Sequence, residues 1–344
     1  MVNKFKVLGV CAGQGALLFT FRKQLIANVE PRSVFHTKGE EQWRLNFGDI
    51  PFLKSYDIPK CKPDIIISSP DCGASSIMRL SKKKTLGKPQ ENKSINLVIQ
   101  SIKELKPKIF LIENLPRLLS FITKNELEEF FPDYKLIYHE SSVSEFGNSQ
   151  ISRKRLVIIG VNYRQAKNYL DAFNNKFRVK ELKVTRNLLE PAYTGTNYMI
   201  PLNKVLAMYD YRRLPSKNNL TVDDIQKLWA NDFKHERKWP IKTAKMVTLP
   251  GVYRLDDDKP PLTLRPADRQ FRPDGWPLGV SDFKNIMGLP KKFKIYMPNE
   301  HNDSEYLYWL NKSRYTIAKG SVYEISIWFK KCLKLIESSR VCGI

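Results

Sequence analysis

The sequence lacks features that define several large classes of proteins. No run of 18 or more apolar residues occurs, so no membrane-spanning helix is predicted. The first residues, MVNKFKVLGV, lack the long apolar stretch of a secretory signal, and we therefore expect an intracellular, cytoplasmic protein. The five cysteines include no Cys-x-x-Cys pair, which argues against a zinc ribbon or disulfide scaffold, and we expect no bound metal.

Acidic residues are scarce relative to basic ones. The chain has 35 Asp and Glu against 58 Lys and Arg, a formal net charge of +23 at pH 7. An excess of this size, spread along the chain, favours a polyanion partner such as nucleic acid. A basic surface that only aids solubility is the alternative. A membrane-surface role is less favoured, because no long basic amphipathic helix occurs.

The first 160 residues alternate between short apolar runs and amphipathic segments. The run at 65–67 is entirely isoleucine, which is typical of a buried strand, and apolar residues recur at helical spacing from Ile95 to Leu105. This alternation predicts an α/β fold with a mostly parallel sheet and helices on both faces. The predicted strands are 5–10, 26–29, 65–67, 109–112, 136–138 and 156–161, and the predicted helices include 16–25, 95–105, 281–288 and 323–335.

The alternation stops near residue 161, which predicts three regions. We expect a catalytic domain over 1–161, a basic target-recognition region over 162–276 and a return to the first domain over 277–344. The middle region is rich in Lys, Arg, Asn, Pro and Tyr, and a capped helix is predicted from Thr221. Its candidate DNA-contacting arginines are Arg212, Arg213, Arg265, Arg269 and Arg272.

A glycine-containing turn follows the first predicted strand. Gly13 and Gly15 allow a tight turn and a close approach of a cofactor, and Glu30, after the second predicted strand, could accept hydrogen bonds from ribose hydroxyls. A plain structural turn explains the glycines equally well, and the third glycine of the dinucleotide fingerprint is missing.

Three further motifs lie beside predicted strands. Cys72 follows the 65–67 strand, where a thiol is placed to act as a nucleophile, although most cysteines are inert. Glu113 follows the 109–112 strand and could act as a general acid, a helix cap or an ion-pair partner. Arg153 and Arg155 precede the last strand, and alternate residues of an extended segment share a face, so both could bind phosphate or a carbonyl oxygen.

The order of these motifs resembles that of the cytosine-5 DNA methyltransferase family. That family carries a glycine-rich S-adenosylmethionine loop, a Pro-Cys nucleophile, a Glu-Asn-Val motif and a Gln-x-Arg-x-Arg motif. Here they correspond to residues 11–15, Cys72, Glu113-Asn114-Leu115 and the segment from Gln150 to Arg155. The segment 277–290 and, weakly, 315–323 resemble the late motifs of the family. The resemblance covers about 1–160 and 277–335, and it implies a Rossmann-like class I methyltransferase domain.

The resemblance implies a role for each matched residue. Cys72 would add to carbon 6 of a flipped cytosine in double-stranded DNA, Glu113 would hold ring nitrogen 3 and the amine, and Arg155, with Arg153, would hold the ring carbonyl. The segment 81–93 would form a loop that closes on DNA. S-adenosylmethionine would be the methyl donor, and the protein would act as a monomer in bacteria or phage. The implied donor-binding residues are Cys11, Ala12, Gly13, Gln14, Gly15, Glu30, Pro31, Asp57 and Ile58, with Asp49 as a rival to Asp57.

The chain also departs from the family pattern. Asp71 replaces the proline before the nucleophile, Cys11 replaces a phenylalanine in the glycine loop, and Gln150 lies one residue too far from Arg153. These departures leave three alternatives open: an RNA substrate, transfer of a modified group from another sulfonium donor, and a catalytically silent DNA-binding protein. A dehydrogenase is disfavoured, because the glycine fingerprint is incomplete.

Overall fold

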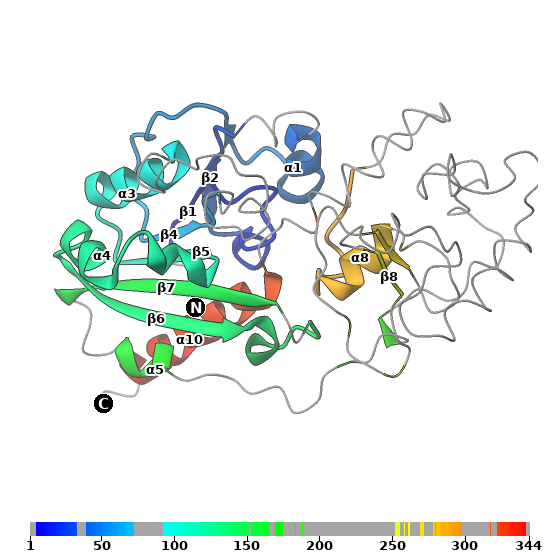
Figure 1. Cartoon of the computed structure of the whole chain (residues 1–344). Helices are drawn as coiled ribbons and strands as arrows, with labels where there is room; N and C mark the ends of the chain where they lie inside the picture. Colours follow the sequence, from blue (N-terminus) through cyan, green and yellow to red (C-terminus); the bar gives the residue numbers. More distant parts are fainter. Residues whose placement is uncertain are drawn as a thin grey trace, which may run out of the picture.

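The computed structural model describes the α/β part of the chain most fully (Figure 1). The described residues are 5–32, 39–71, 92–150, 153–164, 169–174, 183, 187–188, 252–254, 258, 261, 269–271, 278, 280–296, 317 and 322–341. The helix predicted from Thr221 and the nucleophile candidate Cys72 lie outside them. So do four of the five candidate DNA-contacting arginines, and only the backbone of Arg269 is described.

Seven strands of the described residues form one sheet in the order β3-β2-β1-β4-β5-β7-β6. β1 to β5 pair in parallel, and β7 lies antiparallel between β5 and β6. This is the mostly parallel α/β sheet that the sequence predicts. The strands are β1 Val7–Val10, β2 Leu25–Val29, β3 Phe52–Leu53, β4 Ile65–Ser68, β5 Ile109–Asn114, β6 Tyr134–Ser142 and β7 Lys154–Asn162, and a separate parallel pair joins β8 Val252–Arg254 to β9 Arg269–Phe271.

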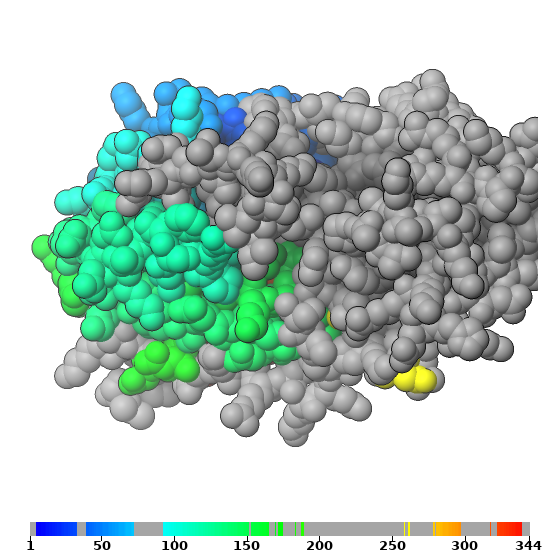
Figure 2. Space-filling model, in the orientation of Figure 1, coloured from blue at the N-terminus to red at the C-terminus, as the bar shows by residue number. Residues whose placement is uncertain are grey.

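Alternate residues of the central strands enter two different hydrophobic cores. Ile65 and Ile67 belong to one core, whereas Ile66 belongs to the other, as the two-residue period of a strand requires. The core around Ile66 is covered by α3 (Lys93–Leu105), η5 (Pro116–Ser120) and α4 (Lys124–Phe130). Figures 1 and 2 show these elements, in cyan and green, forming one side of the domain.

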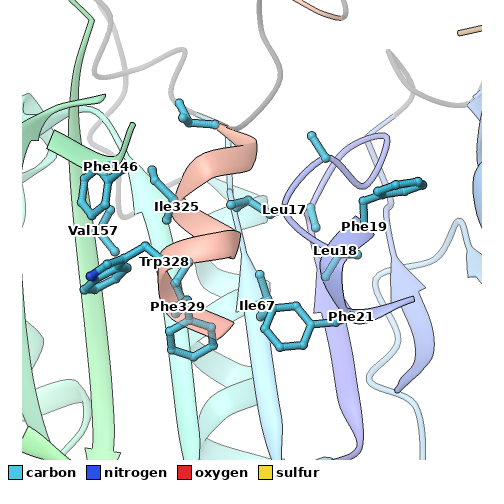
Figure 3. Close-up of a cluster of buried hydrophobic side chains, with 14 of the residues drawn as sticks. Leu17, Leu18, Phe19, Phe21, Ile67, Phe146, Val157, Ile325, Trp328 and Phe329 are labelled. Atoms are coloured by element: carbon cyan, nitrogen blue, oxygen red, sulfur yellow. The ribbon is translucent and has the colours of Figure 1, made fainter. Parts of the chain in front are cut away.

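The other core is closed by the helix α10 (Tyr323–Val341). Trp328 packs edge-on against Phe146 (Figure 3). Phe329 stacks on Phe173 at a centroid distance of 5.4 Å. Phe146 lies in η6 (Val143–Phe146), Phe173 lies in α5 (Leu170–Asn174), and α10 also contacts η2 (Phe19–Phe21). The C-terminal part of the chain therefore covers a sheet made almost entirely from the first 162 residues.

The remaining described helices join the same core. α1 (Gly39–Phe47) contributes Trp43, which stacks on Phe47 at 4.0 Å. α8 (Val280–Ile286) contributes Phe283 and ends before Gly288, whose φ of +69° is readily adopted by glycine. Within the described residues, no helix is long and apolar enough to cross a membrane.

Two sequence predictions differ from the structure. The segment 16–25 was expected to be a helix but contains a single 3₁₀ turn, η2, followed by β2. Its buried apolar residues Ala16 to Phe19 are consecutive, and the exposed residues Arg22 and Lys23 follow as a block, so burial does not alternate with the 3.6-residue period of an amphipathic helix. The strand predicted at 109–112 continues through Asn114, because β7 pairs with β5 over that length.

Candidate active site

Several of the sequence-predicted site residues lie at one edge of the sheet, whereas Cys72 lies outside the described residues. In parallel strands the carboxyl ends share an edge, and there β1 leads into residues 11–15, β2 into Glu30 and β4 into Ser69. Glu113 is near the end of β5 itself. Because β7 is antiparallel, its start reaches the same edge and carries Arg155. Ligands of open α/β sheets bind outside such an edge.

The loop after β1 turns sharply and is held by a buried carboxylate. Cys11, Gly13 and Gly15 have φ values of 53°, 62° and 87°. The Gly13 amide donates to Oε2 of Glu30 at 2.6 Å, and the Asn28 side chain donates to the Gly13 carbonyl at 3.2 Å. A carboxylate beside a tight backbone turn can accept hydrogen bonds from the hydroxyls of a nucleoside ribose, so these residues fit the ribose of S-adenosylmethionine.

The two candidate aspartates for the adenine lie at opposite ends of β3. Asp57 and Ile58 follow this strand and so come after its carboxyl end, on the side of Glu30, whose amide donates to the Leu53 carbonyl at 2.7 Å. Asp49 precedes the strand. Asp57 is exposed, and Ile58 packs against the core around Ile66. Pro31 is buried directly after Glu30.

Glu113 is the centre of a second group of polar residues at the same edge of the sheet. Ser69 donates its hydroxyl to Oε2 of Glu113 at 2.7 Å, and Nε of Arg155 lies 2.6 Å from Oε1. The pairing follows from register: Glu113 lies opposite Val157, so Arg155 is its diagonal neighbour on the same face. The Glu113 and Arg155 side chains are 5% and 13% exposed, which leaves a largely desolvated carboxylate–guanidinium pair at the sheet edge.

The backbone before Cys72 is fixed by hydrogen bonds. The Asp71 amide donates to the Ser94 hydroxyl at 2.9 Å, and the Asn92 side chain donates to the Asp71 carbonyl at 3.2 Å. Asn92 also caps α3, and Asn114 donates to the Pro70 carbonyl at 3.3 Å. The two ends of the segment between Asp71 and Asn92 are therefore tied together beside Glu113. Nearly all of the loop predicted over 81–93 lies outside the described residues.

Three of the five cysteines are described, and none is an activated thiol. Burial raises the pKa of Cys11 to about 12, with Arg32 acting in the opposite sense, and burial also raises the pKa of Cys332 to about 12. The pKa of Cys61 is raised by burial as well. Because a thiolate is the nucleophilic form, these three are unsuited to the role predicted for Cys72.

Arg153 takes a different position from Arg155. It is buried, its carbonyl accepts from the Val143 amide at 2.8 Å, and its positive charge acts to lower the pKa of Glu324 in α10. Arg155 is thus the arginine that the structure brings to Glu113. Among the described residues, no cluster of three or more His, Cys, Asp and Glu is placed to hold a metal ion.

Sequence reasoning missed two residues at this edge. Arg32 forms an ion pair with Glu30 and contacts two further loops, and Ser69 joins β4 to Glu113. Arg32 stands two residues after Glu30, a spacing that places both on one face of an extended segment and could have been noticed. The Ser69 contact depends on the pairing of β4 with β5, which the local pattern does not contain.

The fold is the Rossmann-like fold of a class I methyltransferase. The family model for C-5 cytosine-specific DNA methylases matches residues 30–306, and the chain belongs to this family. The resemblance inferred from the motifs is therefore confirmed.

Individual relatives share less of the chain. It is 28% identical to the Type II methyltransferase M.SsoII of Shigella sonnei over 179 residues, which cover 48% of this chain and 45% of that protein. It is 29% identical to the Type II methyltransferase M1.ScrFI of Lactococcus lactis over 233 residues, 63% of this chain and 56% of that protein. The chain thus spans about half the length of these curated relatives. The crystal structure of the S. pombe Dnmt2 methyltransferase matches with a TM-score of 0.56 at 12% identity, covering 96% of this chain and 97% of that one, which shows a shared fold.

Proposed function

We propose that this protein is a DNA cytosine-5 methyltransferase that uses S-adenosylmethionine. The observation that carries the proposal is the Ser69–Glu113–Arg155 cluster at the sheet edge, beside the anchored backbone of Asp71. A carboxyl group and a guanidinium side by side match the hydrogen-bonding groups on one edge of a cytosine ring. Membership of the cytosine-5 methylase family supports the same chemistry.

In this proposal Cys72 supplies the nucleophile. Its thiolate adds to carbon 6 of the flipped cytosine, which makes carbon 5 electron-rich enough to take a methyl group, and loss of the carbon 5 proton with release of the thiolate restores the ring. Glu113 holds ring nitrogen 3 and the exocyclic amine while the thiolate adds. Arg155, with Arg153, holds the ring carbonyl. Of the three described cysteines none has a lowered pKa, which supports Cys72 as the candidate.

The donor side of the site uses the other half of the sheet edge. S-adenosylmethionine supplies an electrophilic methyl group when bound. The backbone of residues 11–15 would lie close to the cofactor. Glu30 and Pro31 would hold its ribose, and Asp57 and Ile58 would hold its adenine. The position of Asp57 after β3, on the side of Glu30, supports it over Asp49.

The partner and the organisation of the chain are part of the same proposal. Double-stranded DNA fits the net charge of +23, and an intracellular monomer fits a DNA substrate. Residues 162–276 would contact the target sequence, while 1–161 and 277–344 form the catalytic domain. The burial of Phe283 and Trp328 in the core that also contains Val7 supports the return of the C-terminal region to this domain.

The test is covalent trapping. The protein is incubated with S-adenosylmethionine and mixed-sequence duplex DNA containing 5-fluorocytosine, whose fluorine blocks release of the enzyme. We expect a protein–DNA adduct on a denaturing gel, mapped by mass spectrometry to Cys72 and carrying one added methyl group. Cys72→Ser should abolish the adduct, and the matched control Cys61→Ser should keep it.

Each alternative gives a different result in this assay. An adduct with a larger added mass identifies another sulfonium donor. An adduct on 5-fluorocytosine RNA but not on DNA identifies an RNA substrate. Donor binding without any adduct, on DNA or RNA, identifies a silent binding protein and overturns the proposal.

A further inference from the structure

Arg32 connects three loops at the carboxyl edge of the sheet. Its Nε and Nη2 atoms each lie 2.6 Å from an oxygen of Glu30, which forms a two-pronged ion pair. The same guanidinium donates to the Ser69 carbonyl at 3.1 Å and to the Cys11 carbonyl. Arg32 is 14% exposed and Glu30 fully buried, so the network is shielded from water. Burial alone lowers the pKa of Arg32, but the charge and hydrogen bonds of Glu30 raise it above its ordinary value.

Ser69 extends this network to the base side of the site. Its carbonyl accepts from Arg32, while its hydroxyl donates to Glu113 at 2.7 Å. Glu113 in turn pairs with Arg155. A continuous path of hydrogen bonds and ion pairs therefore runs from the donor-side carboxylate Glu30 to the base-side carboxylate Glu113.

The acceptor positions of Glu30 are already filled. A carboxylate has about four lone-pair positions, and Glu30 accepts hydrogen bonds from four N–H groups of Arg32 and Gly13. Three come from the Nε, Nη2 and backbone amide of Arg32, and one from the Gly13 amide. Ribose hydroxyls can bind this carboxylate only by taking positions that Arg32 or the Gly13 amide now holds. Because three of these four positions belong to Arg32, we expect donor binding to change the Arg32 contacts with Glu30, and with them the contact with Ser69.

We propose that Arg32 is a positioning residue through which occupation of the donor site sets the position of Ser69 and Glu113, and hence the affinity for the target DNA. The inference rests on the proposed function, because it assigns Glu30 to the donor and Glu113 to the base. Arginine is needed because its planar fork reaches Glu30, Cys11 and Ser69 together. A lysine has one nitrogen and cannot span them.

The test measures binding, so it does not depend on turnover. The affinity for S-adenosylhomocysteine is measured by calorimetry, and the affinity for a labelled mixed-sequence duplex is measured with and without this compound. The ratio of the two DNA affinities is the coupling factor, and it must be reciprocal. We expect a factor of about fivefold or more in the parent protein and less than about twofold in Arg32→Lys.

Two further variants separate coupling from stability. Ser69→Ala keeps the carbonyl that Arg32 contacts and removes only the hydroxyl on Glu113, so it should lose coupling while its S-adenosylhomocysteine affinity stays within about twofold of the parent. Arg44→Ala removes an arginine–glutamate pair that is exposed on α1, with Arg44 70% exposed, and should keep the coupling.

The possible failures are distinguishable. If the parent does not bind S-adenosylhomocysteine, the proposed function fails. Two results overturn only the role of Arg32. In the first, the parent binds S-adenosylhomocysteine and DNA without coupling, and in the second, Arg32→Lys and Ser69→Ala have the same coupling factor as the parent. If Arg44→Ala also loses the coupling, general destabilisation explains the loss in all variants, and the role of Arg32 is overturned.

Discussion

Nε of Arg155 lies 2.6 Å from Oε1 of Glu113, and β5 and β7, which carry the two residues, run in opposite directions. The pair is largely buried, and a buried charge that loses its partner is costly. The two side chains therefore act as a unit, and the consequences of changing them are not independent.

The first prediction concerns this pair. Glu113→Gln should lower kcat/KM for methyl transfer by about 10²-fold or more. In the proposed mechanism Glu113 acts as an acid on the cytosine ring, and the amide of glutamine cannot transfer a proton. Arg155→Met should also reduce kcat/KM, and the double variant should lose less than the sum of the two. The expected coupling energy is about 0.5–3 kcal/mol.

The control for this prediction is the exposed variant Lys108→Ala, which breaks the Lys108–Asp64 pair and should leave kcat/KM unchanged. If the losses of transition-state free energy in the two single variants simply add in the double variant, Glu113 and Arg155 act independently and the prediction is contradicted.

The second prediction concerns thiol reactivity. Cys11 and Cys332 should react with iodoacetamide at pH 8 far more slowly in the native protein than in the denatured chain, because burial raises both pKa values to about 12. Cys72 should react fastest. The sites are identified by peptide mapping after timed alkylation. Native labelling of Cys11 at the denatured rate would show that its thiol is accessible and would contradict the structure.

The third prediction concerns packing between β5 and β7. A Cβ at Gly160 would lie 2.1 Å from the ring of Phe110, which packs on Phe131 and Tyr134. Gly160→Ala should lower the free energy of unfolding by about 1–3 kcal/mol, as overpacking does. Urea unfolding measures it.

The matched control for this packing prediction is Gly48→Ala. Gly48 has open space around its Cβ position and a φ of +63°, so the substitution should cost less, through backbone strain alone. A further change, Phe110→Leu, should make room and rescue part of the loss in Gly160→Ala. Equal losses in the two alanine variants, without rescue, would refute the packing argument.

The fourth prediction concerns the dependence of stability on pH. Burial raises the pKa of Glu324 to about 7, against hydrogen bonding from its own backbone and from Asn148 and the charge of Arg153, which act to lower it. The folded state therefore binds this proton more tightly than the unfolded chain does. The unfolding free energy should fall as pH rises from about 4.5 to 7, by about 1–3 kcal/mol from this group. Glu324→Gln should remove this part of the slope in pH-dependent urea titrations, and an unchanged slope would contradict it.

Local pattern was enough to predict most of the sheet. The isoleucine run at 65–67 and the apolar spacing from Ile95 to Leu105 correspond to β4 and α3. The direction of β7 could not be predicted, since a two-residue period is the same for parallel and antiparallel strands. The segment 16–25 was wrongly predicted as a helix, because its buried residues 16–19 and its exposed residues 22–23 form two blocks instead of alternating at helical spacing.

The candidate site was predictable only in part. Glu30 and Glu113 could be placed at the sheet edge, since each follows or ends an apolar run. Arg32 could have been noticed from its spacing to Glu30. The contacts of Ser69 with Arg32 and Glu113 could not, because they form only when β2, β1, β4 and β5 pair. Cys72 remains a prediction from the motif, supported by the fixed backbone of Asp71.

The position of α10 has a consequence for biosynthesis. The helix covers Val157 and Ile67 in strands that are translated long before it, with the whole middle region made in between (Figure 3). Until Trp328 and Phe329 emerge from the ribosome, the part of the nascent core that α10 covers lacks this helix and remains open to association with other chains. In this fold the last described helix to be translated therefore completes a core that the first strands begin.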